Sequence, residues 1–156
     1  AGVDFACLRL ANVYGPRQRA EGEGGAVAEF ASRMTSGRTP VIFGTGTQTR
    51  DFIFVADVVN AFIEAALHEG DLASEGPAGP AYNISTGRGT SVLMLAEGLR
   101  VATRYPGDIE HEPARPGDVE ESVLDSAKAE RTFGWRAHVD LQTGLGGTAA
   151  WFTQQA

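Results

Sequence analysis

Short apolar segments with the composition of β-strands alternate along this chain with longer segments of helical periodicity. The short segments are rich in Val, Ile, Phe and Tyr, which favour strands. The longer ones repeat apolar residues every three or four positions, which gives a helix one apolar face. This alternation predicts an α/β domain, and the very short strands suggest a small lobe attached to a larger sheet. The expected strands are residues 3–10, 40–43, 52–55, 81–85, 109–112 and 122–124.

Capping residues mark the ends of several expected helices. Gly37 follows the first helical segment, where a glycine can end a helix in the left-handed conformation. Thr90 or Ser91 precedes the third helix and Asp140 precedes the last, and each can accept a hydrogen bond from the first turn. The expected helices are residues 27–34, 57–68, 92–102, 126–133 and 141–152, and the glycine-rich segments 17–25 and 69–80 are expected loops.

Charge and cysteine content exclude several function classes. The net charge is −7, with 20 acidic against 13 basic residues and no run of Lys or Arg, so we expect neither a nucleic-acid partner nor an anionic membrane. Cys7 is the only cysteine, which rules out an internal disulfide or a thiolate zinc cluster, and its apolar neighbours predict a buried strand residue. No apolar run is long enough to span a bilayer, so we expect a cytoplasmic protein. We also expect no metal site.

One stretch points to a ligand. The glycine pair Gly44 and Gly46 leads to Arg50, and an apolar strand follows at once. A guanidinium group at the start of a strand can bind phosphate through two charge-assisted hydrogen bonds. The stretch therefore favours a phosphate-bearing ligand, and the alternative is a surface ion pair between Arg50 and Asp51.

Several segments, taken in order, resemble the extended short-chain dehydrogenase/reductases of the NAD-dependent epimerase/dehydratase family, in particular its UDP-hexose 4-epimerases. The resemblance covers nearly the whole chain. The segments that carry it are LRLANVYGPRQ (residues 8–18), GGAV (24–27), VIFGTG (41–46), TRDFIFVADV (49–58), YNISTG (82–87), RPGD (115–118), LDSAK (124–128) and FGW (133–135).

The resemblance is to the C-terminal half of that family, so residues 1–156 are expected to be the substrate-binding portion, with the N-terminal Rossmann half absent. The family's Tyr-x-x-x-Lys pair is missing, because neither Tyr14, Tyr82 nor Tyr105 is followed four positions later by lysine. The string GLGGTA (residues 144–149) lies in a helical segment without a preceding strand, so it is expected to serve helix packing. We therefore expect no catalytic residue here, NAD held mainly by the absent half, and an exposed apolar face or edge.

The resemblance implies roles for residues of the arginine-bearing segments. Arg50 and Arg115 would bind the diphosphate of a UDP-sugar, and Asp118 would accept hydrogen bonds from the ribose. Val41 and Phe43, which share one face of their strand, would flank the uracil ring. The alternatives are a salt bridge within the loop for Arg115 and Asp118, and core packing for Val41 and Phe43.

Other implied contacts lie at strand and helix ends. Asn12 would contact the sugar or its phosphate, with a turn or capping role as the alternative, and Asn83 follows the same logic. The backbone of Gly25 and Ala26 would approach the nucleotide. The backbone of Val13 would lie near the nicotinamide of the cofactor.

The function implied for the intact protein is epimerisation of a UDP-hexose at C4, by transfer of hydride to NAD and its return to the other face of a 4-keto sugar. A homodimer is expected. The alternatives are a 4,6-dehydratase or decarboxylase of the same family, and a nucleotide-binding lobe without catalysis.

Overall fold

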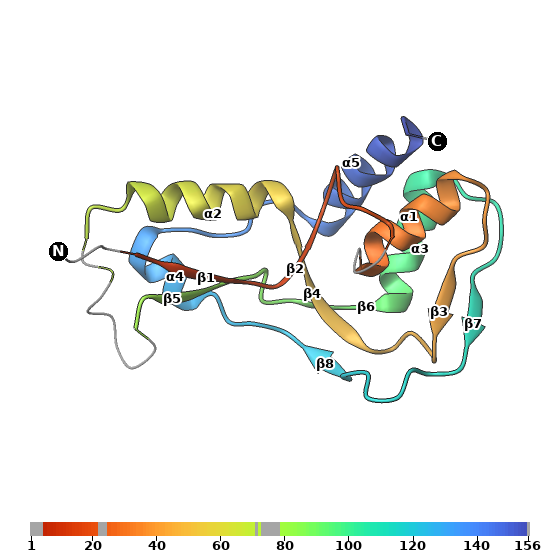
Figure 1. The fold of residues 1–156 in the computed structure, drawn as a ribbon, viewed down its shortest axis with the longest axis horizontal. Coiled ribbons are helices and arrows are strands. Elements are labelled where there is room, and N and C mark those ends of the chain that lie inside the picture. Colours follow the sequence, from red (N-terminus) through yellow and green to blue (C-terminus); the bar gives the residue numbers. More distant parts are fainter. Residues whose placement is uncertain (1–4, 22–24, 71, 73–78, 156) are drawn as a thin grey trace.

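The computed structural model describes residues 5–21, 25–70, 72 and 79–155 (Figure 1). Helices and strands alternate along most of the chain, as the sequence predicts. The elements are β1 (Cys7–Leu10), β2 (Asn12–Tyr14), α1 (Gly25–Thr35), β3 (Val41–Phe43), β4 (Thr49–Phe54), α2 (Val55–Leu67), β5 (Ala81–Ile84), β6 (Gly89–Ser91), α3 (Val92–Thr103), β7 (Glu110–Glu112), β8 (Glu121–Ser122), α4 (Ala127–Phe133) and α5 (Leu141–Thr153).

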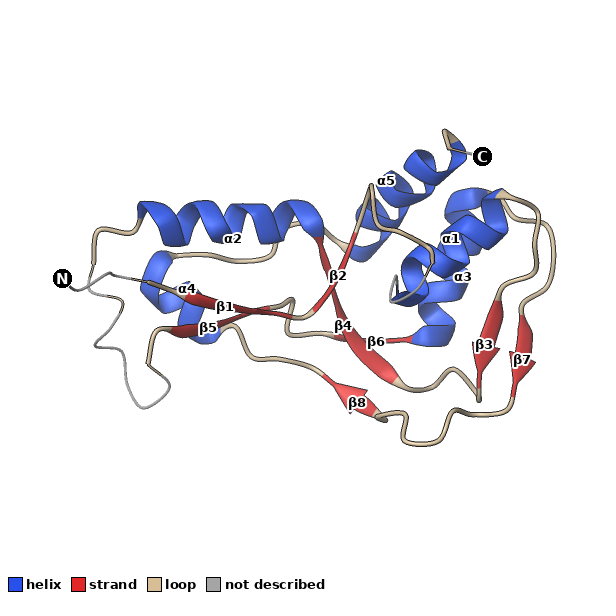
Figure 2. Cartoon of the chain, in the orientation of Figure 1, coloured by secondary structure: helices blue, strands red, loops and turns tan. Residues whose placement is uncertain are grey.

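The strands form three small groups, seen in red in Figure 2. β1 pairs with β5 in parallel, and β3 pairs with β7 in parallel. Between them, β4 pairs with β2 and β8 in parallel and with β6 in antiparallel orientation. β4 is thus the strand on which the central group is built, and the predicted α/β architecture is confirmed.

Two apolar cores stabilise this arrangement. One lies between α2, α4 and the β1–β5 pair, where Tyr82 and Ile84 are fully buried. The other lies among α1, α3 and α5, beside β3 (Figure 1). The apolar faces predicted from helical periodicity supply Phe30, Leu95 and Leu99 to this second core.

The predicted helix caps are confirmed. Gly37 has φ of 70° just after α1, a conformation that glycine adopts without strain. The Ser91 hydroxyl accepts a hydrogen bond from the Met94 amide at 3.1 Å. The Asp140 carboxylate accepts one from the Thr143 amide at 2.9 Å, and this contact keeps the pKa of Asp140 below its ordinary value.

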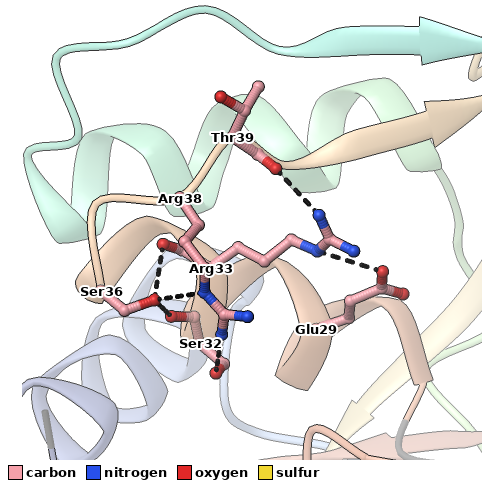
Figure 3. Close-up of polar contacts among 6 residues, drawn as sticks. All are labelled: Glu29, Ser32, Arg33, Ser36, Arg38 and Thr39. Atoms are coloured by element: carbon pink, nitrogen blue, oxygen red, sulfur yellow. Dashed lines mark hydrogen bonds and ion pairs between the residues drawn. The ribbon is translucent and has the colours of Figure 1, made fainter.

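Polar side chains fix the turn that leads from α1 into β3 (Figure 3). The Arg33 side chain pairs with Glu29 at 3.3 Å and donates a hydrogen bond to the Thr39 carbonyl at 3.2 Å. The Ser36 hydroxyl donates to the Ser32 carbonyl at 2.7 Å. These bonds satisfy carbonyl groups near the helix end and set the direction in which the chain enters β3.

The first strand differs from the prediction. Residues 1–4 lie outside the described part; β1 begins at Cys7, and the chain continues after Leu10 as β2, which joins another sheet. Cys7 is exposed, so the expectation of a buried cysteine is wrong. The reason is that β1 has a partner strand on one side alone among the described residues, which leaves much of it open to solvent.

The exposed apolar edge was expected at the first strand, where Leu10 is 40% exposed, and α2 adds an exposed apolar face that was not predicted. Phe62 is 54% exposed and Leu67 is 72% exposed, and Val59 and Ile63 are similarly open. Within the described residues, no helix has both the length and the apolar character needed to cross a membrane. Parts of the two expected loops, residues 22–24, 71 and 73–78, lie outside the described part.

The glycines of α5 predict opposite effects on stability. A methyl group at Gly144 would lie 2.1 Å from the hydroxyl of the buried Tyr14, whereas one at Gly146 would meet nothing within 4 Å. Gly144→Ala is therefore expected to lower the free energy of unfolding by about 1–3 kcal/mol through overpacking. Gly146→Ala should raise it by up to about 1 kcal/mol through helix propensity.

Thermal unfolding of both variants and of the unmodified chain measures this pair. Equal destabilisation by the two substitutions would contradict the packing role assigned to this glycine-rich helix.

Candidate functional site

A pocket of about 570 Å³ opens where β2, β3, β4, the start of α1 and the loop after β7 meet. A volume of this size suits a small-molecule ligand. Almost every residue that the sequence nominated for a site lines it. These residues are Asn12, Val13, Gly25, Ala26, Val41, Phe43, Arg50, Arg115 and Asp118.

Strand alternation in β4 separates Arg50 from its neighbour Asp51. Arg50 lines the pocket, whereas Asp51 is 1% exposed on the other side of the strand. The Asp51 carboxylate accepts hydrogen bonds from the Thr86 amide (2.9 Å), the Thr86 hydroxyl (2.7 Å) and the Gly87 amide (3.0 Å). The alternative of a surface ion pair between Arg50 and Asp51 is therefore wrong.

Arg50 instead pairs with Asp118, which lies far along the chain. One guanidinium nitrogen is 2.5 Å from the Asp118 carboxylate, and another donates to the Thr49 carbonyl at 2.8 Å. The Gln48 side chain donates to the other Asp118 oxygen at 3.2 Å and to the Phe43 carbonyl at 3.1 Å. The alternative pair between Arg115 and Asp118 is replaced by this network, which holds the Arg50 fork at the pocket wall.

Arg115 lies over an aromatic ring. Its guanidinium carbon is 3.7 Å from the centre of the Phe43 ring, a cation–π contact. Val41 and Phe43 are half-buried at the pocket while Ile42 between them is fully buried, as the predicted alternation requires. In the part of the chain that the structure describes, Arg115 forms no ion pair, so its charge is available to an anion.

The other end of the pocket is formed by β2 and the start of α1. Asn12 is paired in register with Phe52 of β4, within a strand rather than at a turn or cap. Gly25 and Ala26 begin α1, where small side chains leave the first amide groups of the helix open to a ligand. The adjoining Gly24, part of the same sequence motif, lies outside the described residues.

Asn83 is the predicted residue that the fold does not bring to this pocket. Its side-chain amide donates a hydrogen bond to the Asp125 carbonyl at 3.0 Å. Asn83 thus tethers β5 to the segment before α4.

Several lining residues were not foreseen, among them Gln18, Gln48 and Phe52. Phe52 could have been found, because it is two positions from Arg50 in β4 and strand residues two apart share a face, whereas Gln48 lies just before the strand. Gln18 lies in an irregular segment with no periodicity to place it.

Comparison with known proteins gives a consistent result. The model of the "NAD dependent epimerase/dehydratase family" matches residues 1–85. A UDP-glucose 4-epimerase from Mycolicibacterium smegmatis is 39% identical over 99% of this chain and 47% of its own length. A dTDP-glucose 4,6-dehydratase from Streptomyces griseus is 32% identical over 97% of this chain and 43% of its own.

Among solved structures, a UDP-glucose 4-epimerase with UDP-glucose from Thermotoga maritima superposes with a TM-score of 0.85. It is 43% identical, and the match covers 95% of this chain and 45% of that one. This chain thus spans about half the length of the relatives it matches. Because the family model matches more than half of the chain, the chain belongs to the NAD-dependent epimerase/dehydratase family.

Proposed function

We propose that the pocket binds a UDP-sugar and that the protein interconverts UDP-glucose and UDP-galactose by epimerisation at C4. The observation that carries the proposal is the convergence of Arg50 and Arg115 on one pocket whose wall includes the Phe43 ring. Two guanidinium groups suit a diphosphate, and an aromatic wall suits a planar base. The names of the two similar UDP-glucose 4-epimerases support the choice of ligand.

In this proposal Arg50 and Arg115 bind the diphosphate, Val41 and Phe43 flank the uracil, and Asp118 accepts hydrogen bonds from the ribose. Arg115 now covers the face of Phe43 on which a base could stack. We expect its guanidinium to move from the ring toward the diphosphate when the nucleotide binds. These contacts to the diphosphate, uracil and ribose then hold the nucleotide in place while the hexose turns.

The cofactor of the family is NAD, which accepts and returns hydride when it is bound. Among the residues that the structure describes, we propose that the backbone of Val13 lies beside its nicotinamide end. The glycine-rich string in α5 does not fit a phosphate, because Gly144 is closed off by the Tyr14 ring. We propose that the remaining contacts to NAD come from a part of the protein outside this chain.

We likewise propose that the acid/base pair of the reaction lies outside this chain. Of the tyrosines here, Tyr14 is 2% exposed and packs edge-on against Phe52 and Phe54. Burial, together with the charges of Asp140 and Asp57, raises the pKa of Tyr14 well above its ordinary value. Such a tyrosine is a neutral packing residue rather than a proton donor to substrate.

The proposed reaction is tested with a full-length protein that contains this chain, supplied with NAD and UDP-galactose. Formation of UDP-glucose to an equilibrium mixture is the expected result. Accumulation of a stable 4-keto-6-deoxy sugar nucleotide would contradict it and favour the dehydratase alternative, to which the Streptomyces relative draws attention.

A further inference from the structure

Gln18 lines the pocket and carries a buried polar atom without a hydrogen-bond partner among the described residues. It lies in the segment between β2 and α1, and its side-chain amide nitrogen donates a hydrogen bond to the Val13 carbonyl at 3.2 Å. The amide oxygen, Oε1, is buried and has no hydrogen-bond partner among the described residues. Among the described residues, Oε1 of Gln18 is the one buried side-chain oxygen or nitrogen found without a hydrogen-bond partner.

The hydrogen bond to Val13 fixes which way the amide group faces. If the group were flipped, two oxygens would oppose each other across the same short distance, so Oε1 is held on the side away from the Val13 carbonyl. A buried acceptor without a donor is unfavourable, and native proteins satisfy nearly all such groups. Gln18 lines the pocket, but Oε1 itself has almost no surface open to it, so a ligand there can supply the missing donor once its binding moves the atoms that cover this oxygen.

The position of Gln18 selects among the donors of a UDP-sugar. A diphosphate has only acceptors at neutral pH, so it cannot satisfy Oε1. The proposed uracil and ribose contacts are at Phe43 and Asp118, whereas Gln18 lies at the β2 end, beside Val13 and with its amide 3.5 Å from where a Cβ of Gly25 would be. Apart from the amide of the nicotinamide proposed beside Val13, which a titration without NAD leaves out, the donors left for this end of the pocket are the hydroxyl groups of the hexose.

We propose that Oε1 of Gln18 accepts a hydrogen bond from a hydroxyl group of the hexose and so positions the sugar in the pocket. This inference rests on the proposed binding of a UDP-sugar and adds a contact that recognises the hexose rather than the nucleotide. Val13 serves the contact indirectly, since its carbonyl holds the Gln18 amide in place.

Calorimetric titration of the chain with UDP-glucose and with UDP tests the proposal, because the two ligands differ by the hexose alone. Gln18→Met keeps the length of the side chain and removes its polar atoms. It is expected to weaken UDP-glucose binding by roughly 5- to 10-fold relative to UDP binding. Gln18→Glu keeps acceptor oxygens, and although its charge repels both ligands, the ratio of their affinities should stay near that of the unmodified chain.

Gln142→Met is the matched control, because Gln142 is exposed on α5 and does not line the pocket. It should change neither affinity. The proposal would be overturned if the ratio of UDP-glucose to UDP affinity were unchanged in Gln18→Met, or fell equally in Gln18→Met and Gln18→Glu. The role of Gln18 would then be limited to its hydrogen bond with the Val13 carbonyl. Failure of the unmodified chain to bind UDP at all would instead contradict the proposed function.

Discussion

Arg50→Ala is expected to weaken binding of UDP to this chain by about 10- to 100-fold, since hydrogen bonds to charged groups contribute about 1.5–3 kcal/mol. Folding should change little. The Arg50 and Asp118 side chains are 17% and 34% exposed, so the pair is partly screened by water and contributes about 1 kcal/mol to folding. The substitution thus separates binding from stability, and titration calorimetry with a parallel thermal melt measures both.

Two further variants sharpen this prediction. Arg50→Lys keeps the charge but loses the planar fork, so its affinity for UDP should lie between those of Arg50→Ala and the unmodified chain. Arg88→Ala removes an exposed arginine that does not line the pocket, and UDP affinity should be unchanged. Equal losses of affinity in Arg50→Ala and Arg88→Ala would mean that general charge, rather than a specific contact, attracts the nucleotide.

Asp51→Ala is expected to lower the free energy of unfolding by about 2–3 kcal/mol, since it removes a buried carboxylate that accepts several hydrogen bonds. The donors are the amide and hydroxyl of Thr86 and the amide of Gly87, all within 3.0 Å of the Asp51 carboxylate. For a domain of this size, the loss corresponds to a fall in melting temperature of roughly 4–12 °C.

Asp108→Ala is the control for this experiment, because Asp108 is exposed. Its melting temperature should match that of the unmodified chain. If Asp51→Ala and Asp108→Ala had the same melting temperature, the hydrogen bonds between β4 and the turn after β5 would not contribute to stability as described.

Local patterns were enough to predict the parts of the site that lie within one strand. Alternation placed Val41 and Phe43 on one face of their strand, and Ile42 between them is in the core. The same rule, applied to Arg50 and Asp51, would have placed their side chains on opposite faces. Cap residues likewise fixed the end of α1 and the starts of α3 and α5, because their hydrogen bonds are made within a few residues.

Contacts between distant segments could not be predicted in this way. The pairing of Arg50 with Asp118 and the stacking of Arg115 on Phe43 depend on where the loop after β7 returns across the sheet. The burial of a strand depends on its neighbours in the fold, which is why Cys7 was misjudged. No sequence pattern reports that the Gln18 oxygen has no partner, since this is a property of the packed structure.

The central claim is that this chain holds the nucleotide part of the substrate. Titration of the purified chain with UDP and, separately, with NAD tests it most directly. We predict saturable binding of UDP with one site per chain, weakened by about 10- to 100-fold in Arg50→Ala, and little binding of NAD. Absence of UDP binding, or tight binding of NAD by this chain, would contradict the account.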